Sequence, residues 1–140
     1  MKKILILLLF SVQAFCYAQA PKGAKTIVVL TDSLSEDAIA MALIEQGYEI
    51  ASTNKYSIKS EPKNIKSWGF QVVVSKVSDG YRVATYASSS ISVYVGSGVS
   101  TGPSTVQCKN RGTKNSAWML GWKQAESVAN ALGNNFRYEM

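Results

Sequence analysis

The stretch from Trp68 to Val95 constrains the fold most, because its apolar side chains recur at every second position. Successive side chains of an extended chain point to opposite faces, so residues two apart share one face. Ser78-Asp79-Gly80 supplies turn chemistry, since glycine tolerates a positive φ and aspartate can bond its own backbone. The pattern predicts a three-stranded antiparallel meander, with strands at Trp68–Val74, Tyr81–Tyr86 and Ile91–Val95.

Other short segments have the composition of strands. Lys25–Thr31 is apolar and rich in β-branched residues, and two further runs follow at Tyr48–Thr53 and Tyr56–Ser60. Residues 96–115 are rich in glycine, serine and threonine, which predicts a long loop; such loops are usually functional, mobile or wrongly assigned. Thr105–Cys108 is a candidate short strand inside this loop.

Two helices are expected. The first covers Ser35–Gln46, with Ser33 and Glu36 at the spacing of a capping box and Gly47 as the residue that ends it. The second runs from Ser116, a candidate N-cap, to a stop at Gly133. Its apolar stripe should lie on the sheet and consists of Trp118, Trp122, Ala125, Val128 or Ala129, and Leu132.

The resulting element order is β-α-β-(β)-β-β-β-α. It predicts one α+β domain over residues 21–140, with an antiparallel sheet of about five strands and two helices on one face.

The helix–glycine–strand–turn–strand segment spans Ala42–Ile50 and Tyr56–Pro62, and the closing stripe runs from Trp118 to Leu132. In these features the chain resembles the TBP-like and helix-grip-like domains of bacterial envelope proteins, which also occur in accessory lipoproteins of the barrel assembly machinery. The resemblance implies a fold of that kind and, since most such domains lack known enzymatic activity, a non-enzymatic role.

The N-terminus has the three parts of a secretory signal peptide. Lys2 and Lys3 precede the apolar run Ile4–Phe10, and Ala18-Gln19-Ala20 forms a small-x-small cleavage site. We therefore expect cleavage near Ala20, a periplasmic or secreted protein, and no transmembrane segment after cleavage. Cys16 follows Phe15 rather than a small residue, so a lipid anchor at Cys16 is the lesser alternative.

Charge and redox chemistry restrict the partners. Without Lys2 and Lys3 the formal charge falls from +6 to +4, which is weak support for an acidic partner. Lysines interleave with Tyr56 and Trp68 as in some nucleic-acid-binding surfaces, but export argues against a nucleic-acid partner and favours a charged sheet edge.

Cys108 would be the one cysteine left after cleavage, so no intramolecular disulfide can form, and a buried thiol is the commoner fate.

The chain lacks the residues that most enzymes use. It has no histidine, so Cys108 has no histidine base even though Lys109 and Arg111 would favour a thiolate. The carboxylates at 32, 36 and 37 lack the glycine-centred pattern of a calcium loop. The glycine run at 96–102 lacks the ending of a phosphate-binding loop. We expect no catalytic residues, no metal and no cofactor.

Two function classes remain. The first is an envelope interaction module that binds an unknown envelope protein through the basic sheet edge and the 96–115 loop, with the basic residues Lys109, Arg111 and Lys114. The second is a carrier that holds an apolar ligand between the closing helix and the sheet, in a pocket lined by Trp68, Phe70, Trp118 and Trp122. Ser33, in Asp32-Ser33-Leu34, is a candidate O-glycosylation site.

Overall fold

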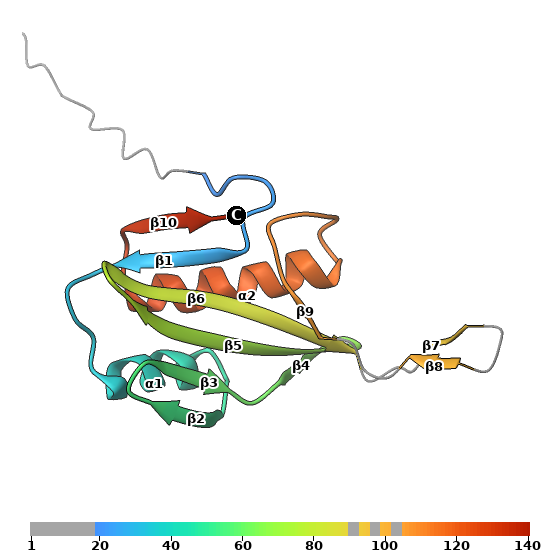
Figure 1. Cartoon of the computed structure of the whole chain (residues 1–140), viewed down its shortest axis with the longest axis horizontal. Helices are drawn as coiled ribbons and strands as arrows, with labels where there is room; N and C mark the ends of the chain where they lie inside the picture. Colours follow the sequence, from blue (N-terminus) through green and yellow to red (C-terminus); the bar gives the residue numbers. More distant parts are fainter. Residues whose placement is uncertain (1–18, 90–92, 96–98, 102–104) are drawn as a thin grey trace, which may run out of the picture.

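A computed structural model of the chain describes residues 19–89, 93–95, 99–101 and 105–140 (Figure 1). The predicted signal peptide lies outside these residues except for positions 19 and 20, and Cys16 lies outside them too. So do Ile91 of the predicted meander and the glycines at 96, 98 and 102. None of the helices within the described ranges is long and apolar enough to cross a bilayer.

The described part of the chain forms an α+β fold around one large antiparallel sheet (Figure 1). The strands of this sheet are β1 (Thr26–Leu30), β2 (Ile50–Asn54), β3 (Ser57–Ser60), β4 (Lys63–Ile65), β5 (Trp68–Val77), β6 (Gly80–Ser89), β9 (Thr105–Gln107) and β10 (Phe136–Glu139). They run in the order β10-β1-β6-β5-β3-β2, with β4 also beside β5 and β9 beside β6. The short strands β7 (Val93–Val95) and β8 (Val99–Thr101) pair with each other.

The sheet corrects the predicted strand arrangement in two ways. The β5–β6 hairpin forms as expected, in register from Trp68 opposite Ser89 to Val77 opposite Gly80. The predicted third strand of the meander is wrong, because β7 pairs with β8 and the neighbours of β6 are β5, β1 and β9. The N-terminal strand β1 lies beside β6 instead, and nearly all of its side chains are buried, as is typical of a strand in the interior of a sheet.

The sheet also has eight strands rather than about five. The candidate strand at Thr105 is confirmed as β9, whereas β4 and β10 lie in segments where no strand was predicted. Both are only three or four residues long, which is too short for a periodic pattern to show. β10 is held by its pairing with β1, more than a hundred residues earlier in the chain.

Helix α1 (Glu36–Glu45) covers nearly the predicted range, but its N-cap lies two residues later than the predicted capping box places it. Ser35, not Ser33, is the N-cap, and its side chain accepts a hydrogen bond from the backbone of Ala38. Gly47 has φ +81°, the left-handed conformation expected of a residue that ends a helix. Helix α2 (Ala117–Leu132) has the predicted N-cap, Ser116, whose hydroxyl accepts from the backbone of Met119.

Both helices pack on the same face of the sheet, where their buried side chains join those of the strands in one core (Figure 1). Trp122, Ala125, Val128 and Leu132 point into this core as predicted. Trp118 does not, since 37% of it is exposed. Gly121 is buried against the sheet instead, where an added Cβ would meet Cys108 and Phe70.

The opposite face of the sheet carries a charged cluster. Val28 is fully buried there, between Arg82 on β6 and Arg137 on β10. Glu139 bridges the two arginines at 2.7 and 2.9 Å, and it accepts a hydrogen bond from the hydroxyl of Thr26. These bonds lower the pKa of Glu139 to about 2, with the bond from Arg82 as the largest cause.

Candidate functional site

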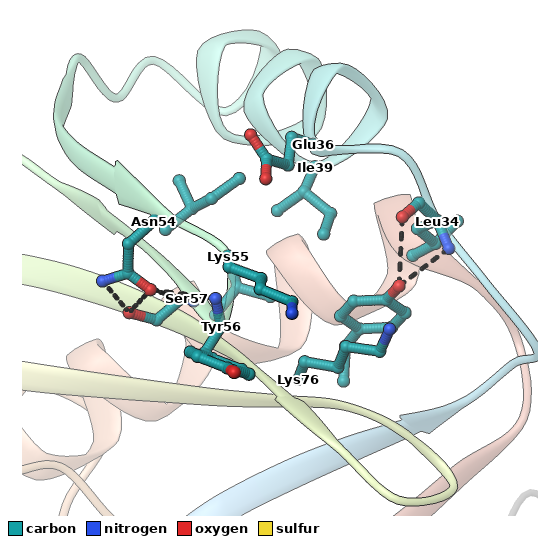
Figure 2. Close-up of a pocket in the computed structure, with 11 residues that line it drawn as sticks. Leu34, Glu36, Ile39, Asn54, Lys55, Tyr56, Ser57 and Lys76 are labelled. Carbon is teal, nitrogen blue, oxygen red and sulfur yellow. Dashed lines mark hydrogen bonds between the residues drawn. The ribbon is translucent and has the colours of Figure 1, made fainter.

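A pocket of about 150 Å³ lies between the start of α1 and the β2–β3 turn (Figure 2). Its floor is apolar and comes from three elements: Ile39 on α1, Ile58 on β3 and Val74 on β5. These three side chains are nearly fully buried, with 1–4% exposed, so the floor is a part of the core that opens to the surface. A volume of this size fits a branched aliphatic side chain or a small ring.

One wall of the pocket is the β2–β3 turn, and its shape is fixed by Asn54. The side-chain oxygen of Asn54 accepts hydrogen bonds from the backbone of Tyr56 and of Ser57, each at 2.9 Å. Such an Asx turn holds the backbone without help from tertiary contacts. The turn therefore presents Lys55 and Tyr56 in a defined position at the mouth of the pocket (Figure 2).

The other wall is the segment between β1 and α1, and Tyr81 on β6 fastens it. The hydroxyl of Tyr81 donates to the backbone oxygen of Leu34 at 3.0 Å and accepts from its nitrogen at 2.9 Å. Figure 2 shows these bonds closing the wall beside the first turn of α1. Both walls are thus held by side-chain-to-backbone bonds, so the pocket is built before any ligand arrives.

The rim of the pocket carries two positive charges and one negative charge. Lys55 and Lys76 reach toward the space between the walls, and Glu36 lies on the helix side (Figure 2). The ammonium of Lys55 also lies 5.5 Å from the ring centroid of Tyr56. Tyr56 is 65% exposed, so most of its aromatic side chain is accessible to a partner. The site suits an apolar group with a carboxylate beside it.

The four residues predicted to line a carrier pocket are not gathered in one place. Trp122 belongs to the main core, whereas Phe70 lies in a second cluster with Cys108, and Trp68 packs against that cluster. Trp118 is a surface residue whose ring faces the ammonium of Lys109, 4.2 Å from its centroid.

The space between α2 and the sheet at this level is filled. A Cβ atom placed on Gly121 would overlap the sulfur of Cys108, and it would lie 2.7 Å from the Cβ of Cys108 and 3.1 Å from the ring of Phe70. Distances this short leave no room for a ligand atom.

The predicted interaction loop is brought together in part. Lys109 and Arg111 line a second hollow, together with Lys22 and Lys25 from the segment before β1. Lys114 is exposed but is not among the residues that line this hollow.

Cys108 is a buried free thiol, as the commoner fate of such a cysteine suggests. Burial raises its pKa to about 12, so the thiol stays protonated at neutral pH despite the neighbouring cations in the sequence. Ser33 is exposed. In the part of the chain that the structure describes, no three metal-ligating side chains gather.

Sequence reasoning missed the pocket residues, although one signal was present. Asn54 marks a turn, and the aromatic Tyr56 stands two residues later within that turn, where small polar residues are usual. The floor was not readable, because Ile39, Ile58 and Val74 come from three separate segments.

Comparisons with known proteins leave the family open: no family model, no curated protein and no solved structure matches the chain.

Proposed function

We propose that this protein is an exported, non-enzymatic interaction module of the cell envelope. It would bind a partner protein by accepting one apolar side chain into the pocket beneath the Asn54–Ser57 turn. The observation that carries the proposal is an apolar floor left open between two rigid walls, with Tyr56 exposed at its mouth. An exposed aromatic residue beside a small preformed pocket is the composition of an interaction hot spot.

Charge at the rim favours one kind of anchor. Lys55 and Lys76 outnumber Glu36, so a partner segment with an acidic residue next to its apolar anchor is preferred. Because the charged ends of these side chains lie at the water-exposed rim of the pocket, the charges should affect specificity and association rate more than total affinity.

Binding rather than catalysis is supported by the chemistry of the chain. The sequence has no histidine, and the pKa of Cys108 is raised by burial, which disfavours a thiolate nucleophile. Export rests on the N-terminal pattern of Lys2-Lys3, Ile4–Phe10 and Ala18-Gln19-Ala20. The resemblance to TBP-like and helix-grip-like envelope domains stays a prediction.

The carrier hypothesis has less support. It requires a cavity bounded by Trp68, Phe70, Trp118 and Trp122, and the close approach of α2 at Gly121 favours a filled interface there. The pocket beside Tyr56 is therefore the proposed binding site for the partner protein.

Site-specific crosslinking in the native envelope tests the proposal. A photoreactive phenylalanine at position 56 should give a defined crosslinked protein, and its yield should fall when Lys55→Glu and Lys76→Glu are added. The matched control is Lys59→Glu with Lys123→Glu, which makes the same charge change at exposed positions that do not line the pocket. The control should keep the crosslink.

Two results would overturn the proposal. One is a crosslink pattern that is the same with and without the rim reversal, which would mean that the pocket selects nothing. The other is an intact mass, measured on protein from its own host, that still includes the first twenty residues and so contradicts export and cleavage near Ala20.

A further inference from the structure

A second hollow, of about 360 Å³, lies where the chain enters β1 and leaves β10. We infer that it is a binding site for a phosphate-bearing ligand, separate from the pocket beside Tyr56. Its lining comprises Lys22, Gly23, Lys25, Lys109, Arg111 and Met140. Four of these six residues are cationic and none has an acidic side chain.

Within the described residues, none of the four cations of the hollow forms an ion pair. The ion pairs in the described residues all involve Arg82 or Arg137 on the far face of the sheet. Four like charges around one concavity repel one another and concentrate a positive potential there. A bound anion with several oxygens would remove that repulsion, which gives the hollow a preference for anionic ligands.

Backbone pairing sets the four cations opposite one another. The nitrogen of Gly23 donates to the oxygen of Asn110 at 2.8 Å, and the nitrogen of Asn110 donates to the oxygen of Ala24 at 2.7 Å. The side chain of Asn110 also donates to the backbone oxygens of Ala20 and Pro21. Lys109 and Arg111 flank one partner of this ladder, whereas Lys22 and Lys25 flank the other, so the two pairs face each other.

One of the cations is also fixed by an aromatic ring. The ammonium of Lys109 lies 4.2 Å from the ring centroid of Trp118, within the range of a cation–π contact. This contact orients the charge without cancelling it. It also makes the tryptophan a natural fluorescence reporter of binding at Lys109.

The mixture of donors favours phosphate over a single carboxylate. An arginine fork can bind two phosphate oxygens at once, and lysines add point charges to the remaining ones. A carboxylate offers only two oxygens and one charge, so it would leave part of the four-cation set unpaired. The volume is large enough for a phosphate with an attached sugar or glycerol.

The test measures binding of sodium pyrophosphate to the mature chain by titration calorimetry and tryptophan fluorescence. Vesicles of phosphatidylcholine, with and without an equal part of phosphatidic acid, form a second arm. The variant Lys25→Gln with Arg111→Gln should weaken binding by about a hundredfold, since each lost charge-assisted bond is worth about tenfold. The control Lys59→Gln with Lys123→Gln changes the net charge equally and should bind as the unmodified chain does.

The two arms identify the source of the phosphate. Binding to pyrophosphate but not to vesicles with phosphatidic acid indicates a soluble ligand. Binding to vesicles that contain phosphatidic acid, but not to vesicles of phosphatidylcholine alone, indicates a lipid headgroup. Equal losses in variant and control would overturn the site, because they would show attraction by net charge only. No binding in either arm, or tighter binding of a polyglutamate peptide than of both phosphate probes, would also overturn it.

Discussion

The replacement of Gly121 by alanine tests how closely α2 packs on the sheet. The added Cβ would overlap the sulfur of Cys108 and lie 2.7 Å from its Cβ. Cys108 cannot easily yield, since its backbone nitrogen is bonded to the oxygen of Thr85 at 2.8 Å and its side chain is buried. The overlap must therefore move the helix or distort the strand that holds Cys108.

The expected magnitude follows from two opposed effects. Overpacking of a filled core costs about 3 kcal/mol at the upper end of its usual range. Alanine in place of glycine in a helix returns about 1 kcal/mol through its better helix propensity. The net loss of about 2 kcal/mol should lower the Tm by roughly 8 °C in a domain of this size.

Thermal unfolding followed by circular dichroism measures this loss. Cys108→Ala removes the overlapping sulfur, so in a double-mutant cycle it should recover about 1 kcal/mol of the damage. Asn130→Ala, at an exposed position on the same helix, is the control and should leave the Tm unchanged or slightly raised. If Gly121→Ala unfolds no earlier than the unmodified chain, there is space beneath α2. The reasoning is then refuted, and the carrier hypothesis recovers its cavity.

Three further predictions concern buried and ionised groups. Thr85→Val should raise the free energy of unfolding by about 1 kcal/mol, because the hydroxyl of Thr85 is buried without a hydrogen-bond partner among the described residues; equal or lower stability in urea would contradict this. The pKa of Glu139 is about 2, below its ordinary value of 4.5, so its carboxylate stabilises the fold above pH 4.5, and that contribution should vanish as the pH falls toward 2. Glu139→Gln should flatten this acid dependence in urea titrations, and an unchanged slope would assign it to other groups. Cys108, with its pKa near 12, should resist alkylation by iodoacetamide at pH 8 until the chain is unfolded, as intact mass would show; rapid labelling of the native protein would contradict its burial.

Local patterns predicted the parts of the fold whose causes are local. The β5–β6 hairpin follows from alternation and one turn, and α2 follows from its cap at Ser116 and its apolar stripe. Even there, one helical residue was placed on the wrong side, because periodicity alone does not say that the small Gly121 rather than the large Trp118 meets the sheet. The first cap was shifted by two residues, since Ser33 and Ser35 both have capping chemistry.

The candidate sites depended on long-range contacts and were largely beyond prediction. Lys109 and Arg111 were chosen from the sequence as interaction residues, but their alignment with Lys22 and Lys25 exists only because Asn110 pairs with the segment before β1. The floor of the other pocket comes from α1, β3 and β5, which no periodic pattern joins.

The sequence by itself determined the α+β class, the helices and the central hairpin, since alternation, helical spacing and capping act between residues close in the chain. Tertiary structure alone decided the place of β1 between β6 and β10, the two added strands β4 and β10, and the gathering of charges around each hollow. The physical reason is range. Hydrogen-bond pairing between strands and contact between distant side chains depend on the path of the whole chain, whereas a strand of three or four residues carries too little local information to reveal its partner.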